Sequence, residues 1–257
     1  MDRFRKRPVH YFFWSHLRIK LKLLFFGLLM SKLPRFHNKH IEKRKYSNSL
    51  LAKSISSKVR FSNKTFFNVN LRGSRLRSCS FKNIKIVLSD FSGVILNKNR
   101  FTNVHFKKCV FYAAIFRDCR FKNCTFEKCI FINTNTESLN HSILDCSKKY
   151  NFYEMKIPDD LKDQLTEYRN IPILQKNRLL HLKGGRINTA TLFILLSKIS
   201  KYKLLNGLKK IYIEEQSKVK ILSTFKLLEE IKNLVDTNTA FKQNNGALPH
   251  PIERLDS

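Results

Sequence analysis

Residues that interrupt or disorder a chain are scarce in this sequence. Only 7 Gly, 6 Pro and 1 Trp occur among 257 residues, which excludes a low-complexity or collagen-like chain. Acidic residues are scarce too, since 19 Asp and Glu stand against 50 Lys and Arg. Apolar residues make up 42% of the chain, with 22 Phe available to fill a core. We therefore expect a folded, strongly basic protein with a polyanionic neighbour.

Motifs of catalysis and metal binding are absent. The sequence contains no GxxxxGK(S/T), HExxH, GxSxG or GxGxxG, and its central acidic residues are too scattered to pair as a general acid and base. The six Cys form no CxxC pair and five recur at multiples of five residues, which favours packed thiols in a reducing compartment over disulfides or metal ligands. The sequence therefore predicts no catalytic residue, no metal site and no cofactor.

What the chain has instead is a repeat of five residues. From Phe61 to Phe131 every fifth residue is large and apolar, fifteen times in succession. Two places before each of them lies a smaller, mostly apolar residue, with Lys64 and Asn99 as the exceptions. A period of five fits neither an α-helix nor a flat strand, so the chain must turn a corner every five residues. This pattern is typical of a solenoid.

The repeat resembles a known family. The segment Phe121–Phe131, FKNCTFEKCIF, is similar to the A(D/N)Lxx motif of pentapeptide-repeat proteins, with Cys in place of Ala and Phe in place of Leu. The resemblance covers residues 59–133 and implies a right-handed four-sided β-helix with about four repeats per coil. Some members of the family bind type II topoisomerases by mimicking duplex DNA, which requires a negative surface. Residues 59–133 hold 15 basic and 3 acidic side chains, so their charge argues against that role.

Residues twenty apart should stack if each coil holds four repeats. Stepping by twenty from Asn63 places Asn63, Asn83, Asn103 and Asn123 in one exterior column, where Asn side chains can bond to their own kind. Basic side chains flank this column and predict a polyanion-binding stripe, for which a solvated face is the alternative. The stripe consists of Arg60, Lys82, Arg100, Arg120 and Lys122. The aromatic residues point inward, so no platform for stacking bases is expected.

A second exterior face carries an apolar patch. Its residues are Val110, Tyr112, Ile130 and Ile132. Apolar surface of this kind usually marks a buried interface. The interface is either with the C-terminal helices of the same chain, or with a second copy in a homodimer or another protein partner.

The N-terminal segment is basic but has no apolar run long enough to span a membrane. The longest, Leu23–Met30, has eight residues, whereas a spanning helix needs about 20. On a helix, residues 10–30 present an apolar stripe opposite a cationic face, which favours an amphipathic helix on an anionic membrane surface. A targeting signal, or a helix that caps the first coil, is the alternative. The predicted membrane-contact residues are Tyr11, Trp14, Leu17, Leu21, Leu24 and Leu28.

These features predict a β-solenoid followed by a small α-helical domain, with an amphipathic helix at the N-terminus. The expected divisions are a basic N-terminal segment (1–45), a linker or first irregular coil (46–58), the β-helix (59–133), a transition or cap (134–157), a helical domain (158–235) and a disordered tail (236–257). Within the helical domain, patterns near Pro158, Pro172, Asn188 and Ser217 predict four helix starts.

The expected function is that of a non-enzymatic scaffold, attached to a membrane through its N-terminal helix and bound to a protein partner. Binding of a nucleic acid or another polyanion by the basic stripe is the alternative. By analogy with the family, a translocated bacterial effector with an N-terminal export signal is a further alternative. The expected location is the cytoplasm, with peripheral attachment to a membrane.

Overall fold

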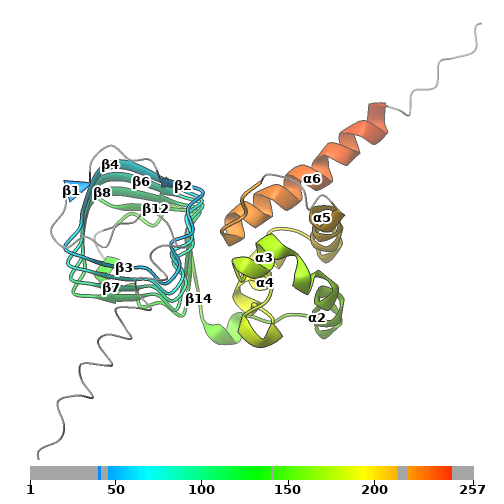
Figure 1. Ribbon diagram of the computed structural model, residues 1–257, viewed down its shortest axis with the longest axis horizontal. Helices are drawn as coiled ribbons and strands as arrows, with labels where there is room; N and C mark the ends of the chain where they lie inside the picture. Colours follow the sequence, from blue (N-terminus) through cyan, green and yellow to red (C-terminus); the bar gives the residue numbers. More distant parts are fainter. Residues whose placement is uncertain (1–39, 42–45, 140–141, 214–218, 245–257) are drawn as a thin grey trace, which may run out of the picture.

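The computed structural model describes residues 40–41, 46–139, 142–213 and 219–244. These residues form a β-solenoid of about 5 turns followed by a helical domain (Figure 1). Figure 1 looks down the solenoid, whose strands stack into a closed, roughly square outline. The strand orders are β1-β4-β6-β8-β11, β10-β7-β5-β3 and β14-β13-β9, with β2 on β4 and β12 on β8. All of these pairings are parallel, as a coil of constant direction requires.

The described strands lie between residues 40 and 150. They are β1 (His40–Ile41), β2 (Tyr46–Ser47), β3 (Ile55–Ser57), β4 (Arg60–Phe67), β5 (Arg75–Arg77), β6 (Ser80–Val87), β7 (Ile95–Asn97), β8 (Arg100–Lys107), β9 (Val110–Tyr112), β10 (Ile115–Arg117), β11 (Arg120–Lys122), β12 (Thr125–Glu127), β13 (Ile130–Ile132) and β14 (Lys148–Tyr150). Phe61 pairs with Phe81, Phe81 with Phe101, and Phe101 with Phe121. The register of twenty residues confirms the expected coil of four repeats.

The corners of the solenoid explain the Asn column. Asn63, Asn83, Asn103 and Asn123 have φ between 52° and 54°, in the left-handed region that Asn tolerates better than most residues. The side chains of Asn83, Asn103 and Asn123 each donate to the Asn in the coil below, with Nδ2 to Oδ1 distances of 3.1, 2.9 and 3.3 Å. The predicted Asn ladder is confirmed, and its residues turn the corner as well as link the coils.

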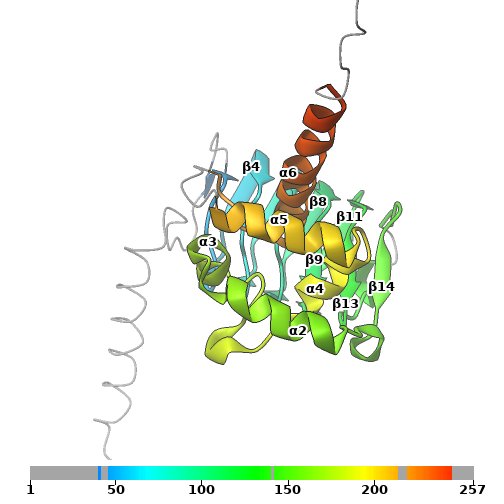
Figure 2. The same cartoon turned by 90° about the vertical axis from the view of Figure 1, so that its right-hand side faces the viewer.

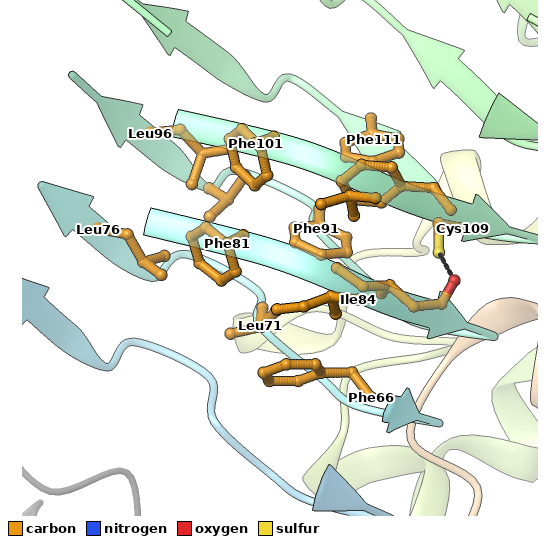
Figure 3. Close-up of a cluster of buried hydrophobic side chains, with 14 of the residues drawn as sticks. Phe66, Leu71, Leu76, Phe81, Ile84, Phe91, Leu96, Phe101, Cys109 and Phe111 are labelled. Atoms are coloured by element: carbon orange, nitrogen blue, oxygen red, sulfur yellow. Dashed lines mark hydrogen bonds between the residues drawn. The ribbon is translucent and has the colours of Figure 1, made fainter. Parts of the chain in front are cut away.

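Stacked aromatic rings fill the interior (Figure 3). The ring centroids of Phe81 and Phe101 lie 4.7 Å apart, and those of Phe106 and Phe126 lie 4.5 Å apart. These distances are close to the spacing of about 4.8 Å between paired strands, so each ring rests on the ring of the next coil. The inward repeat position therefore adds a ring stack to the backbone ladder at every turn.

The smaller inward positions hold thiols in the core. Cys79, Cys109, Cys124 and Cys129 are all at most 1% exposed, which confirms them as core thiols. The Cys109 thiol donates to the carbonyl of Ile86 at 3.5 Å (Figure 3), and burial raises the pKa of Cys109 well above its usual range. The Cys109 thiol therefore stays protonated, and the four buried side chains pack as small apolar residues with a weak donor.

Asn99 is one of the two polar residues at the smaller inward positions, and hydrogen bonds inside the solenoid satisfy its side chain. Its side chain is fully buried, donates to the carbonyl of Leu76 at 2.9 Å and accepts from the amide of Cys79 at 2.7 Å. A buried polar side chain is tolerated when its donor and its acceptor are both used.

Short helical segments and five α-helices follow strand β13 in the described part of the chain. They are η1 (Glu137–Leu139), η2 (Phe152–Glu154), α2 (Asp159–Thr166), η3 (Glu167–Asn170), α3 (Pro172–Lys176), η4 (Lys183–Gly185), α4 (Thr189–Leu196), α5 (Lys201–Ile213) and α6 (Thr224–Asn244). Asn188 accepts from the Thr191 amide and so caps α4, as expected. Helix α5 was not expected; its Gly207 lies against Ile231 of α6, where a Cβ would come within 2.5 Å of a methyl carbon.

The helical domain covers one side of the solenoid (Figures 1 and 2). In Figure 2 helices α2, α4 and α5 lie in front of the strands. Val110, Ile130 and Ile132 belong to the same buried apolar cluster as the helices. Polar contacts also join the two parts, since the Asn68 side chain donates to the carbonyl of Lys220 at 2.6 Å and accepts from the amide of Leu222 at 3.3 Å.

An ion pair with a buried carboxylate also joins the solenoid to the helical domain. The guanidinium of Arg72 is 2.8 Å from the fully buried carboxylate of Asp90 and donates to the carbonyl of Arg178 at 3.1 Å. Because Arg72 links a solenoid carboxylate to the helical domain, we expect Arg72→Ala to lower the free energy of unfolding by about 2 kcal/mol. Urea denaturation measures this loss, with the exposed Arg75→Ala as the control that should stay within about 0.5 kcal/mol of the wild type. Equal effects of the two variants would contradict the expectation.

Candidate functional site

The predicted basic stripe lies on one exposed face of the solenoid. Arg60, Lys82, Arg100, Arg120 and Lys122 are all exposed, and we call this set the basic face. They project from β4, β6, β8 and β11, whose interior side is held by the stacked Phe rings. The register puts Arg60, Arg100 and Arg120 in one row and Lys82 and Lys122 in the next. With coils about 4.8 Å apart, four coils spread these charges over about 15 Å.

Positive charge continues around the corner onto the next face, which the sequence reasoning missed. The additional residues are Lys58, Arg75, Arg77, Lys98 and Arg117, all exposed. The sequence already contained this pattern. Residues twenty apart stack on one another, and steps of twenty place Arg77, Asn97 and Arg117 in one exterior column. Among the described residues of these two faces, Asp118 is the one acidic side chain. Among the described residues, no member of the basic face is within ion-pair distance of a carboxylate.

The neighbouring face at β8 and β12 shows the opposite arrangement. Glu127 Oε1 is 2.6 Å from Lys107 Nζ, and its Oε2 is 3.1 Å from His105 Nε2. The hydrogen bond from Lys107 lowers the pKa of the Glu127 carboxyl below its usual range, with His105 adding to the effect. The charges around Glu127 are therefore locally paired, whereas those on the basic face repel one another and attract an external anion.

The apolar patch predicted as an interface lies beneath the helical domain of the same chain. Val110, Ile130 and Ile132 are at most 3% exposed, and Tyr112 is partly buried against the same cluster. These side chains pack on the chain's own helices, so this surface is not free to receive another protein.

The predicted membrane-contact residues lie outside the described residues. They are Tyr11, Trp14, Leu17, Leu21, Leu24 and Leu28. Within the described ranges, no helix combines the length and the apolarity that crossing a bilayer requires.

The fold and its repeat register define a β-solenoid built from five-residue units. The family of pentapeptide repeats matches residues 100–133 with eight copies of the repeat. The matched residues lie within the solenoid, from the start of β8 to the residue after β13.

The solved structures similar to this chain include pentapeptide-repeat proteins. HetL from the cyanobacterium Nostoc, which is involved in regulating heterocyst differentiation, is 10% identical with a TM-score of 0.33; the match covers 44% of this chain and 56% of HetL. A protein of the Arabidopsis thaliana thylakoid lumen is 13% identical with a TM-score of 0.24, over 61% of this chain and 86% of its own. The fluoroquinolone resistance protein QnrB1 is 12% identical with a TM-score of 0.17, and the match covers 48% of this chain and 89% of QnrB1. No curated protein matches the sequence.

Proposed function

We propose that this protein is a non-enzymatic scaffold that binds a polyanion through the basic face. The supporting observation is the placement of five exposed cations, in register on one face, without a described carboxylate beside them. The apolar patch, which the sequence also offered as a protein interface, is occupied by the chain's own helices. Of the two predicted binding surfaces that lie in the described part of the chain, the basic face is the one not covered by the helices.

The acidic residues of the five-residue repeat, within residues 59–133, favour a binding role over a catalytic one. Asp90 is buried against Arg72, Glu127 is held by Lys107, and Asp118 stands exposed at a corner. They lie on different faces, so no two of them are placed to act as an acid and a base on one substrate.

The phosphate backbone of a nucleic acid is the polyanion that these residues favour. Arg and Lys side chains on a rigid face contact the phosphates of a nucleic acid whatever its base sequence. Reading the bases would require side chains that enter a groove. The Phe rings of the solenoid are buried in its interior and leave no surface for stacking bases. Binding should therefore be strong at low salt and independent of base sequence.

Fluorescence anisotropy of the full chain with labelled probes tests this proposal. Duplex DNA and single-stranded RNA of unrelated sequences should bind, with affinities that depend on charge and not on base sequence. Failure of all nucleic acids to bind at about 50 mM salt would overturn the proposal. Binding to phosphatidylserine vesicles alone would also overturn it, and would assign the basic face to a membrane.

Membrane association remains a separate proposal, supported by the apolar stripe and cationic face of residues 10–30. Deleting residues 1–34 should release the protein from phosphatidylserine vesicles in a flotation assay, while nucleic-acid binding by the basic face persists. Unchanged flotation of the deletion variant would refute the proposed membrane attachment and would leave the proposed binding by the basic face unaffected.

A further inference from the structure

A cavity of about 370 Å³ lies between the upper coils of the solenoid and the helical domain. Its solenoid wall includes Lys108, Lys128 and Ile130, and its helical wall includes Phe225 and Lys232. The volume falls within the range of about 300–1,000 Å³ that is usual for small-molecule sites. The basic face lies on a different side of the solenoid, so this cavity is a distinct candidate site.

The cavity arises where one corner of the solenoid changes from apolar to charged. This corner runs from Leu88 to Lys108 and Lys128, with each residue in the left-handed conformation. Leu88 is 2% exposed and packs into the cluster of the helical domain. Lysines occupy the two coils above it, where a long cationic side chain cannot pack into the apolar cluster as Leu88 does. The helices therefore meet the lower coil directly and leave space beside the upper ones.

The lining combines an apolar floor with a rim of positive charge. Phe225, Leu228, Glu229 and Lys232 are spaced so that they share one side of α6. The floor residues Ile130, Phe225 and Leu228 are at most 7% exposed. Five lysines line the cavity, from both of its walls, against a single carboxylate. The lysines are Lys108, Lys128, Lys148, Lys198 and Lys232.

Little of this positive charge is neutralised by the protein itself. The one lining carboxylate, Glu229, is 2.8 Å from Lys108. Lys128 is 3.9 Å from Glu127, whose carboxylate is already held by Lys107 at 2.6 Å. The other three lysines form no ion pair with a described carboxylate. An anion that enters the cavity would gain attraction from several lysines at once, in a site partly screened from water.

We propose that this cavity binds a small amphipathic anion, with an alkyl or aryl body on the floor and a phosphate or carboxylate at the lysine rim. The apolar floor requires an apolar group, which inorganic phosphate lacks. The rim requires negative charge, which excludes neutral and cationic amphiphiles. The site depends on neither the basic face nor the proposed binding of nucleic acid, so the two proposals can fail separately.

Isothermal titration calorimetry of the full chain with decyl phosphate, below its micelle concentration, tests the proposal. Decyl phosphate should bind, whereas inorganic phosphate and decyltrimethylammonium should not. The double variant Lys128→Glu, Lys232→Glu should weaken binding by about tenfold or more. The matched double variant Lys85→Glu, Lys209→Glu changes the same charge at exposed positions outside the cavity and should bind within about twofold of the wild type.

Alkylation of Cys146 locates the ligand independently. Cys146 lines the cavity and is exposed, whereas Cys119 is partly buried against the solenoid core and does not line the cavity. Decyl phosphate should slow the reaction of Cys146 with iodoacetamide and leave that of Cys119 unchanged, as read by peptide mass spectrometry. No calorimetric binding, equal losses in the two double variants, or no protection of Cys146 would each overturn the proposal. Equal protection by an acidic peptide would also overturn it in favour of a peptide site.

Discussion

Reversing three charges of the basic face, with Arg100→Glu, Arg120→Glu and Lys122→Glu, is expected to weaken nucleic-acid binding by more than about 100-fold at about 50 mM salt. The three residues lie on adjacent coils and point outward from one sheet, so a bound phosphate backbone would meet all of them. The substitutions remove three attractive charges and add three repulsive ones. Anisotropy titrations of labelled duplex DNA with the wild type and the variant measure the difference.

A matched variant separates this local effect from the net charge of the protein. Lys85→Glu, Lys149→Glu and Lys209→Glu change the same number of charges at exposed positions outside the basic face. We expect the matched variant to lose less than about tenfold in affinity, because long-range charge is screened within about 10 Å at this order of salt. If both variants lose affinity equally, binding does not depend on the basic face.

Replacing a central ring, with Phe106→Ala, is expected to lower the free energy of unfolding by about 3–5 kcal/mol. Phe106 is 1% exposed, stacks on Phe126 at 4.5 Å and meets Phe91, Phe101 and Phe111 at 5.7–6.0 Å. The solenoid has one narrow core, so neighbouring coils cannot collapse into the gap without breaking their own backbone ladder.

Urea denaturation followed by circular dichroism measures the loss caused by Phe106→Ala. Phe152→Ala is the control, because Phe152 is 53% exposed beyond the last strand and should change the free energy of unfolding by less than about 1 kcal/mol. A loss in Phe106→Ala no greater than that of Phe152→Ala would contradict the stacked core.

The sequence predicted the middle of the solenoid well because its register is a local property. Each coil repeats the same inward position, so the stacking of Phe61, Phe81, Phe101 and Phe121 and the Asn ladder follow from counting residues. The register of twenty begins before the repeat that the sequence shows clearly, since Tyr46 already pairs with Phe66. The C-terminal end departs from it, because Ile130 pairs with Lys148 at a spacing of eighteen.

The surroundings of the solenoid could not be read from the sequence, because they depend on packing between distant segments. The apolar patch was visible in Val110, Ile130 and Ile132, but the sequence could not choose between the chain's own helices and a partner. Helix α5 was missed, and the lysine-lined cavity exists only because α6 approaches the corner that carries Lys108 and Lys128. The five residues of the basic face were predicted, since exterior register follows directly from interior register.

The salt dependence of duplex DNA binding by the full chain tests the central claim most directly. If five residues of the basic face neutralise phosphates, the logarithm of the binding constant should fall linearly with the logarithm of salt concentration, with a slope of about −4 to −5. The triple charge-reversal variant should show a slope nearer zero, by about 0.9 for each phosphate that the variant no longer neutralises. A flat response in the wild type, or the same slope in the variant, would contradict the claim that this face binds a polyanion.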